Sequence, residues 1–250
     1  MILLLGGVSE SLAIADFLTE KQWSFILSVT TDYGVELAQA HAKSVIKEIF
    51  QPDSLTAFID QNNITLILDA THPFARVISN LAIAVAQKMT VAYLRFERQT
   101  SESPESGVTL VNDFAEVCGR LSAMEGLIYL STGSKTAPDY AQVLGLDRLH
   151  VRVLPTTSVL SKLTTAGFDA TQIDAIRGPF TTNLNIELFR RVNAAVVVTK
   201  ESGKQGGVQE KIAAAQALSI PCLVIRRPVI DYPRQVSNLT ALARALEMTS

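Results

Sequence analysis

The amino-acid sequence predicts an α/β protein of two doubly wound, mainly parallel-sheet, Rossmann-like domains that face each other across a cleft. Short apolar runs alternate with amphipathic segments from one end of the chain to the other. In the first part of the chain the apolar runs lack polar alternation, which is typical of parallel strands buried on both faces. With 250 residues, of which 48% are hydrophobic, the chain is long enough to bury two such cores.

In the first part of the chain, short apolar runs predict strands, and apolar residues at helical spacing predict helices. The expected strands are residues 2–5, 25–29, 44–50, 65–70 and 91–95. The expected helices are residues 12–18, 35–42, 55–62 and the alanine-rich 74–88. This alternation is that of parallel βαβ units, so residues 1–100 are expected to form a dinucleotide-binding-like domain.

A polar segment rich in turn formers, residues 99–107, interrupts the alternation and predicts a linker. Beyond it the alternation resumes, so residues 101–250 are expected to form a second α/β domain. Its expected strands are residues 126–131, 149–154, 173–176, 195–199 and 222–225. Its expected helices are residues 114–123, 137–144, 158–166, 184–192 and 207–218. A last expected helix, residues 235–247, is able to pack on either domain.

Composition and missing motifs exclude several classes of function. The formal net charge of −2 argues against a nucleic-acid binder. No apolar run approaches the ~20 residues of a membrane-spanning helix, so a cytoplasmic protein without membrane contact is expected. Cys118 and Cys222 form no CxxC motif or Cys/His cluster, which predicts free thiols and no metal site. The oligomeric state stays open between a monomer and a small homo-oligomer.

The loop after the first expected strand is a candidate phosphate site, because open parallel sheets bind ligands at the carboxyl ends of their strands. Gly6 and Gly7 allow close approach of the backbone, and the next helix offers unpaired N–H groups. Ser9 is able to cap that helix or to donate to a phosphate oxygen, and Glu10 follows it. The third glycine of GxGxxG is missing, so a tight turn with a capping serine remains the alternative.

The loop after the second expected strand contains Thr30, Asp32 and Tyr33. A dinucleotide-binding fold contacts the adenosine ribose at this position. Asp32 would accept from a 2′-hydroxyl and repel a 2′-phosphate, which favours NADH slightly over NADPH. The alternative is a carboxylate that merely starts the next helix.

Residues 69–75 place several polar groups after the fourth expected strand, with Pro73 expected in the first turn of the next helix. His72 is a candidate proton donor that Asp69 would orient, and the alternative is a structural histidine. Cationic residues also follow the strands, although the chain as a whole is slightly acidic. Their concentration predicts a polyanionic ligand. The cationic residues concerned are Arg95, Arg98, Arg177, Lys200, Lys204, Arg226 and Arg227.

These segments, in this order, resemble the precorrin-6A reductase family of cobalamin biosynthesis, from residue 5 to residue 228. The matching segments are Leu5-Gly6-Gly7-x-x-Glu10, residues 69–75, Arg95-x-x-Arg98, Ser131-Thr132-Gly133, Arg177-Gly178-Pro179-Phe180, Thr199-Lys200-x-Ser202-Gly203 with Lys211, and Arg226-Arg227-Pro228. The resemblance implies a reductase that transfers a hydride from NADH or NADPH to a polycarboxylate tetrapyrrole. A dinucleotide-sensing or ligand-binding module without catalysis is the alternative.

The resemblance also implies roles for individual residues. His72, Asp69 and Lys200 would be catalytic. The cofactor would contact Gly6, Gly7, Ser9, Glu10, Thr30, Asp32, Tyr33, Thr71, Thr132 and Gly133. The substrate would contact Arg95, Arg98, Arg177, Ser202, Gly203, Lys211 and Arg226. The loop around Asp32 is similar to that of the anaerobic branch, whose substrate ring carries cobalt.

Overall fold

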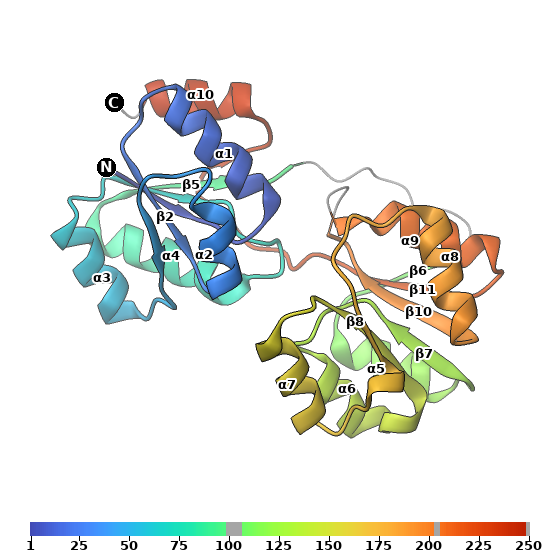
Figure 1. Cartoon of the computed structure of the whole chain (residues 1–250). Helices are drawn as coiled ribbons and strands as arrows, with labels where there is room; N and C mark the ends of the chain where they lie inside the picture. Colours follow the sequence, from blue (N-terminus) through green and yellow to red (C-terminus); the bar gives the residue numbers. More distant parts are fainter. Residues whose placement is uncertain (99–106, 203–205, 249–250) are drawn as a thin grey trace. The chain divides into compact units, whose positions relative to one another are not determined.

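The computed structural model describes residues 1–98, 107–202 and 206–248, which belong to two compact units (Figure 1). Unit 1 consists of Met1–Gln99 and Pro228–Ser250, and unit 2 of Thr100–Arg227. The expected second domain of residues 101–250 therefore needs a correction, because the chain returns to unit 1 after Arg227. Most of the expected linker lies outside the described residues.

The sheet of unit 1 has six strands in the order β12-β5-β4-β1-β2-β3, and all neighbouring strands pair in parallel. The strands are β1 (Ile2–Leu5), β2 (Phe25–Val29), β3 (Val45–Lys47), β4 (Leu66–Asp69), β5 (Ala92–Phe96) and β12 (Gln235–Val236). The chain runs outward from β1 to β3 and then returns to the other side of β1. The strand order therefore reverses between β1 and β4, where open α/β sheets bind their ligands.

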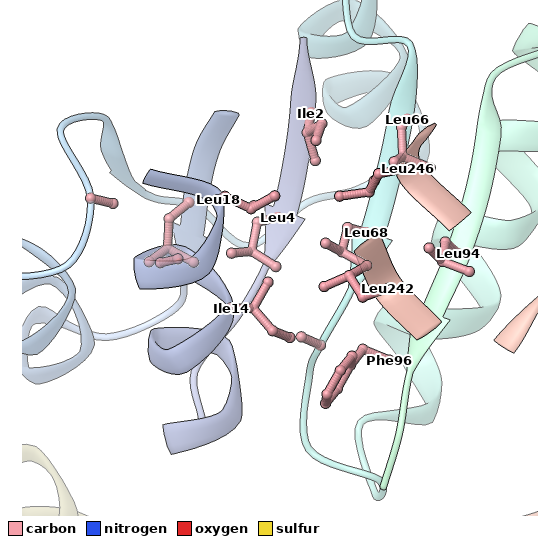
Figure 2. Close-up of a cluster of buried hydrophobic side chains, with 14 of the residues drawn as sticks. Ile2, Leu4, Ile14, Leu18, Leu66, Leu68, Leu94, Phe96, Leu242 and Leu246 are labelled. Carbon is pink, nitrogen blue, oxygen red and sulfur yellow. The ribbon is translucent and has the colours of Figure 1, made fainter. Parts of the chain in front are cut away.

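Helices cover both faces of this sheet. They are α1 (Ser9–Glu20), α2 (Asp32–Ala38), α3 (Pro52–Gln61), α4 (Arg76–Met89) and α10 (Leu239–Glu247). Figure 2 shows Ile14 of α1 and Leu242 of α10 pointing onto the same strands, next to Leu4 and Leu68. On the opposite face, α3 and α4 bury Leu55 and Val85 against the sheet. The final helix, whose domain the sequence left open, is thus part of the core of unit 1.

The sheet of unit 2 repeats the same arrangement with the order β6-β11-β10-β7-β8-β9, again all parallel. Its strands are β6 (Val108–Val111), β7 (Leu127–Leu130), β8 (Leu149–Val153), β9 (Ile173–Ala175), β10 (Ala194–Lys200) and β11 (Cys222–Ile225). Its order reverses between β7 and β10. In both units a strand from outside the regular βαβ series, β12 or β6, completes one edge of the sheet.

The helices of unit 2 also lie on both faces of its sheet (Figure 1). They are α5 (Phe114–Ser122), α6 (Ala137–Leu144), α7 (Thr157–Thr165), α8 (Thr182–Arg191) and α9 (Val208–Ala217), with short 3₁₀ turns η1 (Leu146–Arg148) and η2 (Ala170–Gln172). Phe189 of α8 and Ile212 of α9 pack on Tyr129 and Val197 of the sheet. None of the helices among the described residues is long and apolar enough to cross a membrane.

The prediction of an α/β fold with two doubly wound parallel sheets is confirmed, and every expected strand and helix is present within a few residues of its expected bounds. Two strands, β6 and β12, were not predicted. The expected helix over residues 235–247 is wrong at its start, because β12 occupies Gln235–Val236 and the helix begins at Leu239. The Asn238 side chain accepts a hydrogen bond from the Ala241 N–H, and this cap sets the helix start.

Candidate active site

Several of the residues singled out in the sequence lie at the two points where strand order reverses. In unit 1, Gly6 and Gly7 follow β1, and residues 69–75 begin at the end of the neighbouring strand β4, where Leu5 pairs with Asp69. In unit 2, Thr132 and Gly133 follow β7, and Lys200 ends the neighbouring strand β10. Each unit therefore has a candidate ligand-binding edge of its own.

The loop after β1 is held close to the sheet. A Cβ on Gly6 would lie 2.7 Å from Leu27 Cδ1 and 2.8 Å from Ser11 Oγ, so any other residue would have to displace these side chains. Gly7 has φ +114° and nothing within 4 Å of its Cβ position, so its backbone is open to a ligand.

Ser11 organises this loop and was missed in the sequence. Its Oγ accepts from the Gly7 N–H at 3.1 Å and donates to the Val8 carbonyl at 2.6 Å. Val8, not Ser9, is the N-cap of α1, so the expected capping by Ser9 is wrong; Ser9 donates to Glu10 Oε2 at 3.2 Å. The position of a serine three residues after the cap is the signal that would have found Ser11.

Asp32 is an exposed residue at the start of α2, in the loop that follows β2. Its Oδ1 lies 2.5 Å from Lys47 Nζ, and the hydrogen bond and charge of Lys47 lower the pKa of Asp32. Thr31 caps the helix by accepting from the Gly34 N–H at 3.0 Å. Asp32 thus starts a helix, as the alternative interpretation predicted. Its side chain is exposed, and only one of its carboxylate oxygens is bonded to Lys47.

Asp69 lies at the centre of a buried polar network at the end of β4. Its Oδ1 accepts from Thr71 Oγ1 at 2.7 Å and from Arg95 Nη1 at 2.8 Å. Its Oδ2 accepts from Ser79 Oγ at 2.6 Å and from the Tyr93 hydroxyl at 2.7 Å. Burial acts to raise the pKa of Asp69, but the charge of Arg95 and these hydrogen bonds lower it, so the carboxylate stays ionised.

The network corrects three expected roles. Asp69 is 0% exposed and Arg95 only 1%, so Asp69 does not face a reacting ligand and Arg95 does not present its charge to a substrate. Thr71 is buried beside them and uses its hydroxyl within the network. Among the described residues, the hydrogen bonds of Asp69 include none to His72, so Asp69 does not orient the histidine directly.

His72 sits in a turn that precedes α4. The Phe74 N–H donates to His72 Nδ1 at 3.2 Å, and the Ala75 N–H donates to the His72 carbonyl at 2.8 Å. Pro73 lies in this turn rather than in the first turn of α4, which begins at Arg76. The His72 side chain is half-buried, which leaves part of the ring accessible at the edge of the sheet.

Arg95 also connects the site to the returning chain. Its Nε donates to Glu97 Oε2 at 2.9 Å, and its guanidinium lies 5.2 Å from the centroid of the Tyr232 ring. The backbone N–H of Arg95 donates to the Arg234 carbonyl at 2.9 Å, beside the pairing of β5 with β12. Tyr232 stacks on Tyr93, with ring centroids 6.5 Å apart. No pattern in the sequence pointed to Tyr93 or Tyr232, because their contacts come from distant segments.

In unit 2, Lys200 joins the two strands at the point of reversal. Its Nζ donates to the Thr132 carbonyl at 2.8 Å. Burial and the charge of Lys135 lower the pKa of Lys200. Gly133 has φ +87° and nothing within 4 Å of its Cβ position, so the loop after β7 is open like that after β1.

The remaining predicted substrate residues divide into exposed and buried ones. Arg98, Arg177 and Arg226 are exposed at the carboxyl ends of β5, β9 and β11. Ser202 is half-buried, and Gly203 lies outside the described residues. Lys211, in contrast, is 6% exposed, and its Nζ lies 2.5 Å from the Gly206 carbonyl oxygen.

Comparison with known proteins places the chain in a family. The model of a family described as "Precorrin-6x reductase CbiJ/CobK" matches residues 1–247. The chain is 34% identical over 250 residues to the cobalt-precorrin-6A reductase of Priestia megaterium, covering 98% of each chain. This chain belongs to the precorrin-6x reductase family. The resemblance seen in the sequence is confirmed, and with it the expectation of a reductase rather than a binding module without catalysis.

Further relatives agree with this membership. The cobalt-precorrin-6A reductase of Methanocaldococcus jannaschii is 36% identical over 233 residues, or 93% of this chain and 92% of its own. The precorrin-6A reductase of Rhodobacter capsulatus is 28% identical over 231 residues, or 92% and 88%. A solved structure of CobK precorrin-6A reductase has a TM-score of 0.80 at 23% identity, covering 100% of this chain and 97% of that one. That similarity confirms the fold.

The buried ion pair generates a first prediction. Arg95→Met leaves the Asp69 carboxylate in a dry site without its cation, so the free energy of unfolding should fall by about 3–5 kcal/mol. Urea denaturation of the variant and the parent chain measures this difference. Arg244→Met, which removes an exposed arginine from the same unit, should change the value by about 0.5 kcal/mol or less. Equal losses in the two variants would show that the pair contributes nothing specific.

A second prediction concerns the titration of Lys211. Burial and the charge of Arg152 lower its pKa from 10.5 to about 7, so the unfolded chain binds one more proton between these values. Charging of the buried amine therefore opposes folding fully below about pH 7 and progressively less as the pH rises towards about 10. Lys211→Met should raise the midpoint of thermal unfolding by about 4 °C or more at pH 6.

The gain in unfolding temperature from Lys211→Met should shrink steadily as the pH rises and vanish near about pH 10. Differential scanning calorimetry of the variant and the parent chain at pH values from about 6 to about 10 checks this trend. The matched control is Lys88→Met on α4, whose side chain is exposed and whose removal should leave no such pH-dependent difference. A constant offset at all pH values would contradict the assignment.

Proposed function

We propose that this protein transfers a hydride from a reduced nicotinamide dinucleotide to a double bond of precorrin-6A, or of its cobalt complex, in cobalamin biosynthesis. One observation carries the proposal beyond family membership. The carboxyl edge of each sheet has an open glycine turn, at Gly7 or Gly133, and also carries cationic side chains. Such edges suit a phosphate-bearing cofactor together with a substrate rich in carboxylates.

The loop after β1 fits the pyrophosphate of a dinucleotide. Gly7 leaves open space where a side chain would stand, and the N-terminus of α1 follows directly. Gly6 and Gly7 would let the phosphates approach the backbone closely, and Ser9 would hold them by its N–H and hydroxyl groups, since the helix dipole favours negative charge. Glu10 follows this loop in the first turn of α1, and the open turn at Gly133, after Thr132, offers a second such position in unit 2. When bound, the reduced nicotinamide supplies the hydride.

We favour NADH as the cofactor because of the charge at the end of β2. The lowered pKa of Asp32 keeps its carboxylate ionised, and the side chain is exposed. A carboxylate accepts hydrogen bonds from ribose hydroxyls and repels a 2′-phosphate. Thr30 and Tyr33 frame this position. Lys47 weakens this preference for NADH over NADPH, since its ammonium group already donates a hydrogen bond to one carboxylate oxygen of Asp32.

The exposed cations are assigned to the substrate. Arg98, Arg177 and Arg226 would pair with acetate and propionate carboxylates of the tetrapyrrole, with Ser202 as a further donor. Lys200, beside the open turn at Gly133, would stabilise the charge that develops as the ring is reduced. The cobalt complex is the favoured substrate, because the relatives above 30% identity are named cobalt-precorrin-6A reductases.

His72 is the proposed proton donor. Reduction of the double bond by two electrons places a hydride on one atom and a proton on its neighbour. The accessible part of the His72 ring lies in the turn after β4, next to the proposed pyrophosphate loop. Asp69 and Arg95 serve this step indirectly by fixing the strand end from which the turn starts.

The proposed activity is tested by anaerobic stopped-flow absorbance at the reduced-nicotinamide band. Cobalt-precorrin-6A should cause oxidation of both cofactors, faster with NADH than with NADPH. In Asp32→Ala the ratio of the two rates should move towards NADPH by about ten-fold, because the repulsion of the 2′-phosphate is removed. Tight cofactor binding without oxidation of either cofactor would refute the proposed reaction.

A separate prediction addresses His72. His72→Ala should slow single-turnover reduction by about 10²–10⁴-fold if the ring donates the proton, with the affinity for the cofactor unchanged. His41→Ala is the control, since His41 lies on the surface of the same unit and pairs with Asp16. Unchanged single-turnover reduction in His72→Ala would assign the proton to solvent and leave His72 a structural role.

A further inference from the structure

The adjacent strands β10, β7 and β8 of unit 2 carry polar side chains side by side near their carboxyl ends. Leu130 of β7 pairs with Val198 of β10 and with Val151 of β8. The next residues along these strands are Thr199, Ser131 and Arg152. They lie two positions beyond Val197, Tyr129 and His150, and therefore share the face of the sheet that α8 and α9 cover.

Arg152 is a buried cation whose hydrogen-bond partners are neutral. Its side chain is 6% exposed, and Nη1 donates to Asn185 Oδ1 at 2.7 Å while Nη2 donates to Ser131 Oγ at 3.0 Å. The guanidinium also lies 4.3 Å from the centroid of the Phe180 ring. Within the described part of the chain, no carboxylate comes within ion-pair distance of it.

The acid closest to Arg152 along the sheet is already occupied. Asp174 pairs with Arg152 in the β8–β9 register. Its Oδ2 accepts from the Tyr129 hydroxyl at 2.6 Å, and its Oδ1 bonds to Arg191 and lies 3.2 Å from His150 Nε2. Asp174 therefore influences Arg152 from a distance but does not neutralise it by direct contact.

A second buried cation, Lys211, lies on α9, which covers the same face. Its Nζ contacts the Gly206 carbonyl oxygen, and the charge of Arg152 acts on it strongly enough to help lower its pKa. Its titratable neighbours besides Arg152 are Glu210 and Cys222, and neither forms an ion pair with it among the residues described. In the part of the chain that the structure describes, two like charges are thus buried on one face of the sheet without a counter-ion.

A buried threonine hydroxyl lies on the same face of the sheet as Arg152 and Lys211. Thr199 is 0% exposed, and its Oγ1 has no hydrogen-bond partner in the described residues. A buried hydroxyl without a partner and a buried charge without a counter-ion each reduce stability. Their occurrence together at one strand end is explained if a ligand supplies the missing oxygen atoms.

We propose that Arg152 and Lys211, with the hydroxyls of Thr199 and Ser131, bind one anionic oxygen group, a carboxylate or a phosphate. The site lies at the carboxyl edge of unit 2, next to the open turn at Gly133. Nicotinamide dinucleotides carry phosphates and corrin precursors carry carboxylates, so the choice of ligand rests on the proposed function. The presence of the anion site does not depend on the proposed function.

Equilibrium binding without turnover tests the site. Arg152→Met and Lys211→Met are titrated with NADH, with NADPH and with uroporphyrin, a stable polycarboxylate tetrapyrrole, at neutral pH. Each variant should bind one class of probe about 10- to 100-fold more weakly than the parent chain, as expected for loss of a hydrogen bond to a charged group. Weakened nucleotide binding identifies a phosphate of the cofactor, and weakened uroporphyrin binding identifies a substrate carboxylate.

The control is Arg190→Met, which removes an exposed arginine of α8 that pairs with Glu187. It should bind every probe as the parent chain does. Lys211→Met is suited to the test because removal of its buried charge is expected to stabilise the fold. Parental affinity of both variants for all probes would overturn the proposal, as would a parent chain that binds none of them. Weakened binding in a chain that oxidises no cofactor would uphold the anion site and refute only the proposed reaction.

Discussion

The buried ion pair between Asp69 and Arg95 is the interaction on which the geometry of unit 1 depends. Its members end β4 and lie within β5, and its hydrogen bonds extend to Ser79 of α4 and to Thr71 of the site loop. Glu97 and Tyr232 close the opposite side of the guanidinium. Because a buried charge is tolerated only when its partners are in place, the strand end, the helix and the returning chain must assemble together.

The fold was predictable because its rules act locally. Parallel strands buried on both faces leave short apolar runs in the sequence, and crossover helices leave a helical period between them. The two strands that were missed, β6 and β12, lie at sheet edges. β12 has only Gln235 and Val236, too few residues to show a period, and its partner β5 lies far away in the sequence. Such pairing is decided by the completed sheet rather than by the segment itself.

The location of the candidate site could be predicted from the sequence, but the role of each side chain could not. Strand-end position identified Arg95 and Arg98 equally, yet Arg95 is sealed inside the network while Arg98 is exposed. The difference arises from an acid on a neighbouring strand, which a pattern of single residues does not display. Arg152 was not singled out because it lies within the expected strand of residues 149–154, whereas the search for cations covered the residues that follow strands.

The return of the chain to unit 1 has a consequence for the order of events during synthesis on the ribosome. Unit 2 is continuous, Thr100–Arg227, so all of its strands have been made before the final segment is translated. Unit 1 precedes it in the chain but lacks β12 and the core residues Leu242 and Leu246 until the segment after Arg227 has been made. The unit that is started first is therefore completed after the other, and its strand β5 stays unpaired on one side until β12 has been made.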